Sequence, residues 1–145
     1  MRSRVSVVLA AALAWSMPAG ADVLRIGLQA DPSTLDPAQS AAFVDRVVMA
    51  AVCDKLIEVD ARLAYVPQLA TEWSWAPDGL SLTMKLRAGV TFHDGEPFDA
   101  EAVRFNIERD KTASYSRRKS ELAPVKSVTV IDPFIRMQVE PALPP

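Results

Sequence analysis

The sequence predicts a mixed domain of helices and strands, of the α/β or α+β class. Apolar and polar residues alternate over residues 24–30, as in a strand with one buried face. Residues 40–56 instead repeat apolar side chains at helical spacing, and residues 70–86 and 125–139 alternate again around turn-forming residues. Helices and strands mixed in this order are typical of a layered domain with one core. The length that follows the first 21 residues fits one domain at most.

The first 21 residues have the pattern of a secretory signal peptide. Two arginines precede an apolar run, and the small residues Ala-Gly-Ala end the pattern at Ala21. A membrane-spanning helix needs about 20 consecutive apolar residues, whereas a serine and a proline interrupt this run. We therefore expect cleavage between Ala21 and Asp22 and a periplasmic mature chain. No cysteine lies near the cleavage site, so no lipid anchor is expected.

Charge and cysteine content argue against several classes of function. Without the two leader arginines, the 16 basic residues become 14, and the 18 acidic residues give the mature chain a formal charge of −4. Nucleic-acid binders usually carry a clustered basic face, so no nucleic-acid partner is expected. The one short basic run, residues 117–119, is interpreted as a solvated loop. Cys53 is the single cysteine, and its apolar neighbours favour a small buried side chain on a helix over a nucleophile.

The first predicted strand leads into a loop that is a candidate ligand site. Its sequence DPSTLDP, residues 31–37, contains two Asp-Pro steps and a Ser-Thr pair. These residues disfavour regular structure and suit a tight surface loop. Loops that leave the end of a first strand commonly carry ligand sites.

A helix is expected to follow this loop, with Ser40 as its N-cap. Its apolar stripe consists of Val44, Val47, Val48, Ala51, Val52 and Leu56. Asp45 and Arg46 lie outside the stripe, which we expect to pack against the sheet.

Two hairpins are predicted further along the chain. The first turns at the Pro-Asp-Gly sequence of residues 77–79, and residues 80–86 then alternate between apolar and polar side chains. Trp73 and Trp75 share one face of the entering strand. They could stack on a ligand, but a structural role is favoured because strands are rich in aromatic residues. The second hairpin turns at the Asp-Pro sequence of residues 132–133.

His93, Asp94, Glu96 and Asp99 resemble a chemical cluster. A zinc site commonly uses three or four ligands with paired histidines or cysteines, and no second histidine or cysteine lies nearby. The acidic residues also lack the register of a calcium loop. No serine stands in a nucleophile-elbow pattern, while a carboxylate pair for glycoside hydrolysis stays open with nothing specific to mark it.

A structural interpretation explains more of the same residues. Asp94-Gly95 fits a turn after a strand that ends at Phe92. Asp99 fits a helix N-cap, with Glu101 in the positively polarised first turn. Along that helix we expect Ala102, Val103, Phe105 and Ile107 to make apolar contacts, and Arg104, Glu108 and Arg109 to face water.

Residues 63–109 resemble the signature region of family 5 of the bacterial extracellular solute-binding proteins, the oligopeptide-, dipeptide- and nickel-binding components of ABC importers. The matching motifs are P-x-L-A-x-x-W at residues 67–73, DGL from Asp78, KLRxGVxFHDGxPF at residues 85–98, and AEAV from Ala100. The segments LRIGLQADPSTLDP and SELAPVKSVTVIDP match as well. The resemblance therefore covers nearly all of the mature chain.

The resemblance implies part of the N-terminal lobe of a two-lobe periplasmic-binding-protein fold, the class II venus-flytrap. Its two α/β lobes close around a peptide or a small solute, such as a nickel chelate, and deliver it to an ABC permease in the inner membrane. Members are several times longer, so residues 22–145 are expected to be an incomplete N-terminal lobe that binds solute weakly or not at all. A monomer with no cofactor, metal or enzymatic activity is implied. The alternative is a secreted hydrolase whose catalytic part lies beyond residue 145.

The resemblance also implies where the first lobe contacts its ligand. These contacts come from the loop after the first strand, the start of the following helix and the segment after the signature helix, here residues 33–36, 41–46 and about 115–119. The candidate ligand-binding residues are Ser33, Thr34, Leu35, Asp36, Ala41, Phe43, Arg46, Tyr115 and Arg117.

Overall fold

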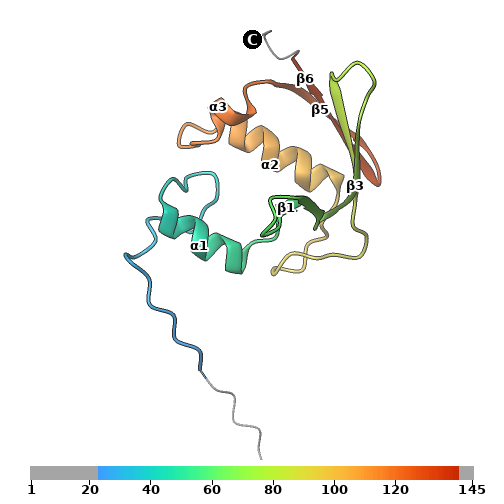
Figure 1. Ribbon diagram of the computed structural model, residues 1–145. Helices are drawn as coiled ribbons and strands as arrows, with labels where there is room; N and C mark the ends of the chain where they lie inside the picture. The colour runs from blue at the N-terminus through green and yellow to red at the C-terminus, as the bar shows by residue number, and fades with distance from the viewer. Residues whose placement is uncertain (1–22, 141–145) are drawn as a thin grey trace, which may run out of the picture.

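The computed structural model describes residues 23–140, in which a twisted sheet has a long helix along one face (Figure 1). The helices are α1 (Phe43–Val52), α2 (Ala100–Thr112) and α3 (Lys119–Leu122). The strands are β1 (Ile57–Val59), β2 (Tyr65–Pro67), β3 (Ala70–Trp75), β4 (Ser81–Leu86), β5 (Val125–Ile131) and β6 (Phe134–Val139). The predicted signal peptide lies outside the described residues.

Both predicted hairpins are confirmed, and together they form the main sheet. β3 pairs with β4 and β5 pairs with β6, all antiparallel, and the strand order is β3-β4-β6-β5. Gly79 closes the first turn with a φ of 68°, a conformation that glycine adopts at little cost. The hairpins therefore follow from local turn chemistry and alternation.

The two faces of this sheet differ in polarity, because successive side chains of a strand point to opposite faces and apolar and polar residues alternate along these strands. On one face, Met84 lies opposite Trp73 and Ile135 in the neighbouring strands. On the other face, Thr83 lies opposite Ser74 and Arg136. One side of the sheet is thus apolar and ready to be covered.

Helix α2 covers the apolar face. Met84 and Ile135 from the sheet are almost fully buried, and Val103 and Ile107 pack on them from α2. The complete core cluster is Ala70, Met84, Leu86, Ala100, Val103, Ile107, Val125 and Ile135. The prediction that the earlier helix packs on the sheet is wrong, because α1 contributes nothing to this cluster and lies beside β1 (Figure 1).

The region before α2 differs from the prediction at two points. Residues 24–30 form no strand, and Leu24 and Ile26 are 83% and 72% exposed. A strand needs a neighbour for its backbone N–H and C=O groups, and residues 24–30 pair with none of the described strands.

The predicted helix from Ser40 is also shorter than expected. It begins after Ala42 and ends at Val52, so Leu56 lies outside it, and β1 follows instead. Cys53 is the half-buried C-cap residue, and its thiol donates to Met49 Sδ over 3.7 Å.

The structural interpretation of residues 91–110 is confirmed for the turn and the cap. Gly95 has a φ of 92°, and its N–H donates to the carbonyl of Phe92 over 3.0 Å. Asp99 Oδ1 accepts a 2.8 Å hydrogen bond from Ala102 N at the start of α2. The apolar contact expected of Phe105 is wrong, because the ring is 62% exposed. A residue two positions after Val103 points to the opposite side of a helix.

Candidate functional site

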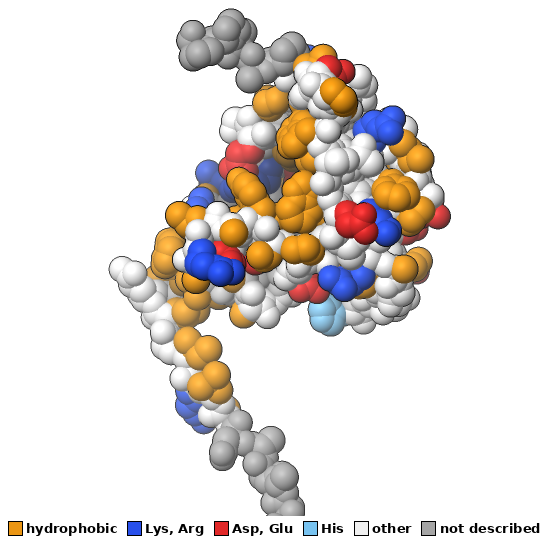
Figure 2. Space-filling view, turned by 45° about the vertical axis from the view of Figure 1, so that its right-hand side comes forward, with side chains coloured by type: hydrophobic (Ala, Val, Ile, Leu, Met, Phe, Trp, Pro, Cys, Tyr) orange, Lys and Arg blue, Asp and Glu red, His pale blue; other side chains and the backbone are white. Residues whose placement is uncertain are grey.

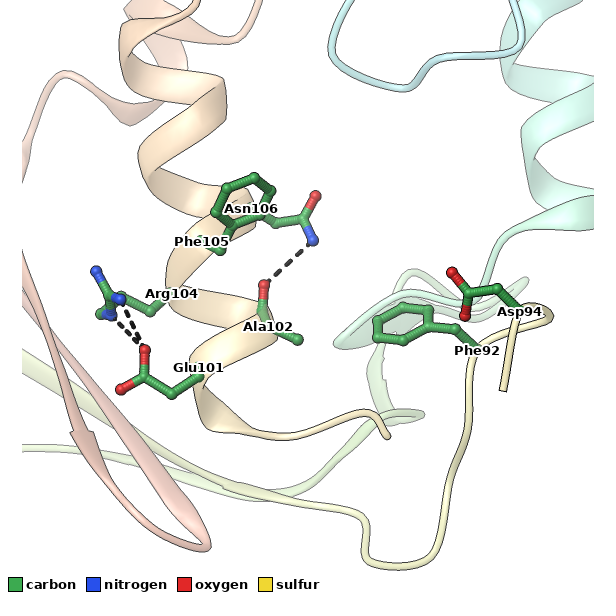
Figure 3. A pocket seen from close by; sticks show the side chains of 7 residues that line it. All are labelled: Phe92, Asp94, Glu101, Ala102, Arg104, Phe105 and Asn106. Carbon is green, nitrogen blue, oxygen red and sulfur yellow. Dashed lines mark hydrogen bonds and ion pairs between the residues drawn. The ribbon is translucent and has the colours of Figure 1, made fainter. Parts of the chain in front are cut away.

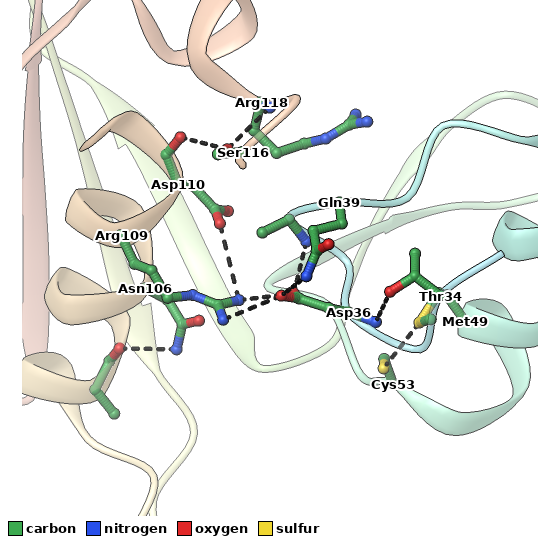
Figure 4. A network of polar contacts seen from close by, with 12 residues as sticks. Thr34, Asp36, Gln39, Met49, Cys53, Asn106, Arg109, Asp110, Ser116 and Arg118 are labelled. Carbon is green, nitrogen blue, oxygen red and sulfur yellow. Dashed lines mark hydrogen bonds and ion pairs between the residues drawn. The ribbon is translucent and has the colours of Figure 1, made fainter. Parts of the chain in front are cut away.

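The structure brings together the three segments predicted to contact ligand. The loop of residues 33–36 is tied to α2 by an ion pair between Asp36 and Arg109, 73 positions apart in the sequence (Figure 4). The third segment is tied by its backbone to the residues that follow this loop, since Arg117 N donates to the carbonyl of Ala38 over 2.8 Å. Arg118 adds a bond from its guanidinium to the carbonyl of Ser40.

The ion pair between Asp36 and Arg109 is partly buried. Arg109 Nη2 lies 3.0 Å from Asp36 Oδ1, and Nη1 lies 3.5 Å from Oδ2. The side chains are 30% and 23% exposed for the arginine and the aspartate. Burial opposes ionisation of Asp36, but hydrogen bonds from Gln39 and Ala38 and the charge of Arg109 leave its pKa below the ordinary value. The expectation that Arg109 faces water is therefore wrong.

The loop itself is held by its own short polar side chains, as its sequence predicts. Asp36 N donates to Thr34 Oγ1 over 3.0 Å, and Asp36 Oδ1 accepts from Ala38 N over 2.9 Å. Gln39 Nε2 donates to the other carboxylate oxygen over 3.1 Å. These are the turn contacts that Asp and Thr favour. They give Thr34 Oγ1 and the carboxylate of Asp36 protein partners.

The segment after α2 is held in a similar way. Ser116 Oγ donates to the carbonyl of Asp110 over 2.6 Å and accepts from Arg118 N over 3.1 Å (Figure 4). Arg118 also pairs with Glu121 over 2.7 Å. The basic run at residues 117–119 is thus no simple solvated loop, because its middle residue makes these contacts. Burial raises the pKa of Asp110, although the charge of Arg109 acts in the opposite direction.

The candidate side chains that remain exposed in these three segments are apolar, aromatic or cationic. Leu35, Phe43 and Tyr115 are 70%, 78% and 49% exposed. Arg46 and Arg117 are exposed, and neither has a salt-bridge partner within residues 23–140. Of the other candidates, Ser33 and Ala41 donate to Asp45. We call the five free side chains the exposed set; they suit contact with a ligand and offer no nucleophile paired with a base.

A groove lies beside this surface, between the end of α1 and the length of α2. Its volume is about 690 Å³, and Pro37, Cys53, Ile107 and Asp110 are among its lining residues. A second, shallower hollow of about 500 Å³ lies at the start of α2 (Figure 3). It is lined by Phe92, Asp94, Glu101, Ala102, Arg104, Phe105 and Asn106. None of the candidate ligand-binding residues lines either space.

The chemical-looking cluster has mainly structural contacts. Asp94 Oδ1 accepts from Glu96 N over 3.1 Å within the turn, and Asp99 caps α2. His93, the single histidine, is exposed (pale blue in Figure 2), and residues 23–140 contain no group of three or more His, Cys, Asp or Glu side chains placed to hold a metal ion. Across the same residues, no helix has the length and apolar character needed to cross a membrane.

The chain is similar to known solute-binding proteins. Residues 64–134 match the family described as bacterial extracellular solute-binding proteins, family 5 middle. The glutathione-binding protein GsiB of Escherichia coli K12 is 28% identical over 130 residues, which are 89% of this chain and 25% of the relative. The chain thus spans about a quarter of the length of the curated relatives that it matches.

Solved structures share the fold. NikZ from Campylobacter jejuni, in complex with Ni(L-His), is 28% identical with a TM-score of 0.67, over 76% of this chain and 22% of that one. OppA from Haemophilus influenzae, in complex with the peptide RPPGFSPFR, is 19% identical with a TM-score of 0.72, over 79% of this chain and 26% of that one. The fold of residues 23–140 is therefore the fold found in part of such proteins.

Proposed function

We propose that this chain, as a member of family 5 of the bacterial extracellular solute-binding proteins, contributes one wall of a solute-binding site that serves an ABC importer. The wall consists of residues 33–36, 41–46 and 115–119. In this proposal, residues 22–145 are part of an N-terminal lobe, the mature chain is periplasmic after loss of residues 1–21, and the partner is a cognate ABC permease in the inner membrane.

One observation carries this proposal. Ser33 and Asp45 join the first two segments by hydrogen bonds, and the pair of Asp36 and Arg109 ties the first segment to α2. The third segment, far away in the sequence, is joined to residues between the first two by the bonds from Arg117 N to the Ala38 carbonyl and from the Arg118 guanidinium to the Ser40 carbonyl. The five side chains of the exposed set lie on these segments and are exposed. A frame that is rigid and side chains that are free are what a binding wall requires.

The solute class is proposed from chemistry and from the relatives together. A surface of Leu35, Phe43 and Tyr115 with Arg46 and Arg117 suits a small solute that carries both an apolar part and a carboxylate. The matched relatives include proteins named or crystallised with glutathione, a nickel–histidine complex and a peptide. A peptide or a related carboxylate-bearing solute, including a metal chelate of an amino acid, fits these features.

A single wall should bind weakly. A solute favours the closed form of a two-lobe protein only through contacts with both lobes, and closure supplies most of the burial that gives affinity. We therefore expect the chain alone to give no micromolar isotherm in calorimetry with reduced glutathione or with mixed tripeptides. An isotherm with a dissociation constant of about 10 μM or less would contradict the one-wall account.

Ligand-observed NMR detects the weak binding that the proposal requires. In saturation-transfer spectra with reduced glutathione or a tripeptide at millimolar concentration, signal should pass from the chain to the ligand. The double variant Arg46→Ala with Arg117→Ala should lose most of this transfer. Arg62→Ala with Arg87→Ala, which removes two exposed arginines outside the wall, should retain it. Equal transfer from both double variants would contradict the assignment of the wall.

A further inference from the structure

Asp45 is a buried charge in the first turn of α1. The sequence predicted only that it lies outside the apolar stripe of this helix. Its side chain has no exposed surface, and it is one of the three largest fully buried side chains of residues 23–140. A buried carboxylate is costly unless hydrogen bonds replace the water that it has lost. Its contacts therefore show what the charge does.

Both carboxylate oxygens of Asp45 are used to hold the candidate binding loop. Oδ1 accepts from Ser33 N over 2.8 Å, and Oδ2 accepts from the Ser33 hydroxyl, also over 2.8 Å. Oδ2 accepts in addition from Ala41 N over 3.3 Å and from Ala42 N over 3.2 Å. One side chain thus joins the two ends of the loop, residues 33 and 41–42, and satisfies N–H groups at the start of α1 that the helix leaves unpaired.

We propose that Asp45 is a positioning residue for the solute-binding wall: its carboxylate fixes the backbone at both ends of the loop of residues 33–42 and so sets where Leu35 and Phe43 are presented. The role of Asp45 in solute binding rests on the proposed function. The hydrogen bonds of Asp45 are observed independently of it. Leu35 lies between the two fixed ends, and Phe43 directly follows the second. Both side chains are largely exposed.

The charge on Asp45 is part of this arrangement. Hydrogen bonds from the Ser33 side chain and backbone, with those of Ala42 and Ala41, hold the pKa of Asp45 below its ordinary value, while burial acts against them. No charged side chain is among the groups that shift it. The positive end of α1 also favours an anion in the first turn. Asparagine has nearly the same shape, but it carries no charge and has an NH₂ group that would meet the donors at Oδ2.

The variant Asp45→Asn tests the inference without any solute. We expect amide hydrogen exchange at Ser33, Ala41 and Ala42 to rise by at least about tenfold, because local opening of the loop loses its central acceptor. Exchange in α2, at Val103 and Ile107, should be unchanged. Asp54→Asn is the matched control, since Asp54 is an exposed aspartate just after α1, and it should leave all of these amides unaffected. Unchanged exchange at the loop in Asp45→Asn would overturn the inference.

A titration of the unaltered chain covers the case in which Asp45→Asn fails to fold. The carboxyl carbon of Asp45 and the amides of Ser33 and Ala42 should follow one common midpoint below the ordinary aspartate value. Amide midpoints that differ from that of the Asp45 carboxyl would overturn the inference. Failure of the proposed function is distinguishable, because a chain without solute binding would still show the common midpoint and the faster exchange.

Discussion

The ion pair between Asp36 and Arg109 fastens the loop to α2. Removing this pair is the simplest test of that attachment. Asp36→Asn keeps an oxygen that can still accept from Ala38 N, so the local turn should survive. Arg109→Gln removes the charge and the paired donors. The two single variants and the double variant form a double-mutant cycle, in which the coupling energy reports the interaction of the two side chains.

The expected coupling energy follows from the geometry of the pair. Exposed ion pairs contribute about 0.2–1 kcal/mol, whereas removing one partner of a fully buried pair costs about 3–5 kcal/mol. Here the side chains are 30% and 23% exposed, and the closest N–O distance is 3.0 Å. We expect a coupling of about 1 kcal/mol, at the top of the exposed range. Urea unfolding at pH 7 measures it, and a value within about 0.3 kcal/mol of zero, the error of additivity, would refute the fastening role.

The same cycle should depend on pH in one direction. Because the folded-state pKa of Asp36 is lowered, its contribution is complete above the unfolded-state pKa and is lost as the pH falls through the folded value. The coupling should therefore be constant from pH 7 to about pH 5 and should decline once the pH is below 3.8. The pair of Arg104 and Glu108, which is 37% and 51% exposed, is the matched control and should show a smaller coupling.

Three further predictions concern the core, a helix cap and a buried carboxyl. Met84→Ala removes a side chain that is 1% exposed and should cost about 2–5 kcal/mol in urea unfolding; Phe105→Ala should cost less than about 0.5 kcal/mol, and equal losses would contradict the assigned core. Asp99→Ala should destabilise the chain by about 1 kcal/mol and Asp99→Ser by much less, so equal effects would argue against the cap. Burial raises the pKa of Asp110, against the opposing charge of Arg109, so its ionised form costs stability above the folded pKa. Asp110→Asn should then raise the melting temperature at pH 7, and the difference from the unaltered chain should vanish below the ordinary aspartate pKa. A lower melting temperature of the variant at pH 7 would contradict this interpretation.

The parts of the fold that the sequence predicted correctly are those with local causes. The first hairpin depends on a glycine with positive φ and on side chains that alternate within a few residues of it. The cap at Asp99 acts three residues along the chain. Signals of this kind are complete within a short window, so they can be recognised without knowing the rest of the fold.

The parts that the sequence missed depend on partners elsewhere in the chain. Residues 24–30 alternate like a strand, but alternation does not provide the neighbouring strand that pairing requires. Arg109 looks like any exposed arginine on a helix until Asp36, 73 positions earlier, is placed beside it. The burial of Arg109 thus follows from a tertiary contact that the local sequence does not show.

The candidate site was predictable as a set of segments and less so as a set of roles. The resemblance indicated residues 33–36, 41–46 and 115–119. In the structure Ser33 bonds to Asp45, and Arg117 and Arg118 bond to Ala38 and Ser40, which lie between the first two segments. The resemblance could not indicate that the carboxylate of Asp36 is already occupied by protein groups. Asp45 did carry a local signal, since an acidic residue at the third position of a helix can accept from the N-cap backbone.

Protein-observed NMR of the chain during titration with reduced glutathione or a tripeptide tests the central claim most directly. At millimolar ligand, the claim predicts that backbone amide shifts move in residues 33–46 and 115–119 and remain still in the outer face of the sheet, for example at Thr83 and Arg136. Variants Arg46→Ala and Arg117→Ala should weaken this response. Shifts confined to the groove between α1 and α2, or no shifts with any carboxylate-bearing peptide, would contradict the assignment of this surface as a solute-binding wall.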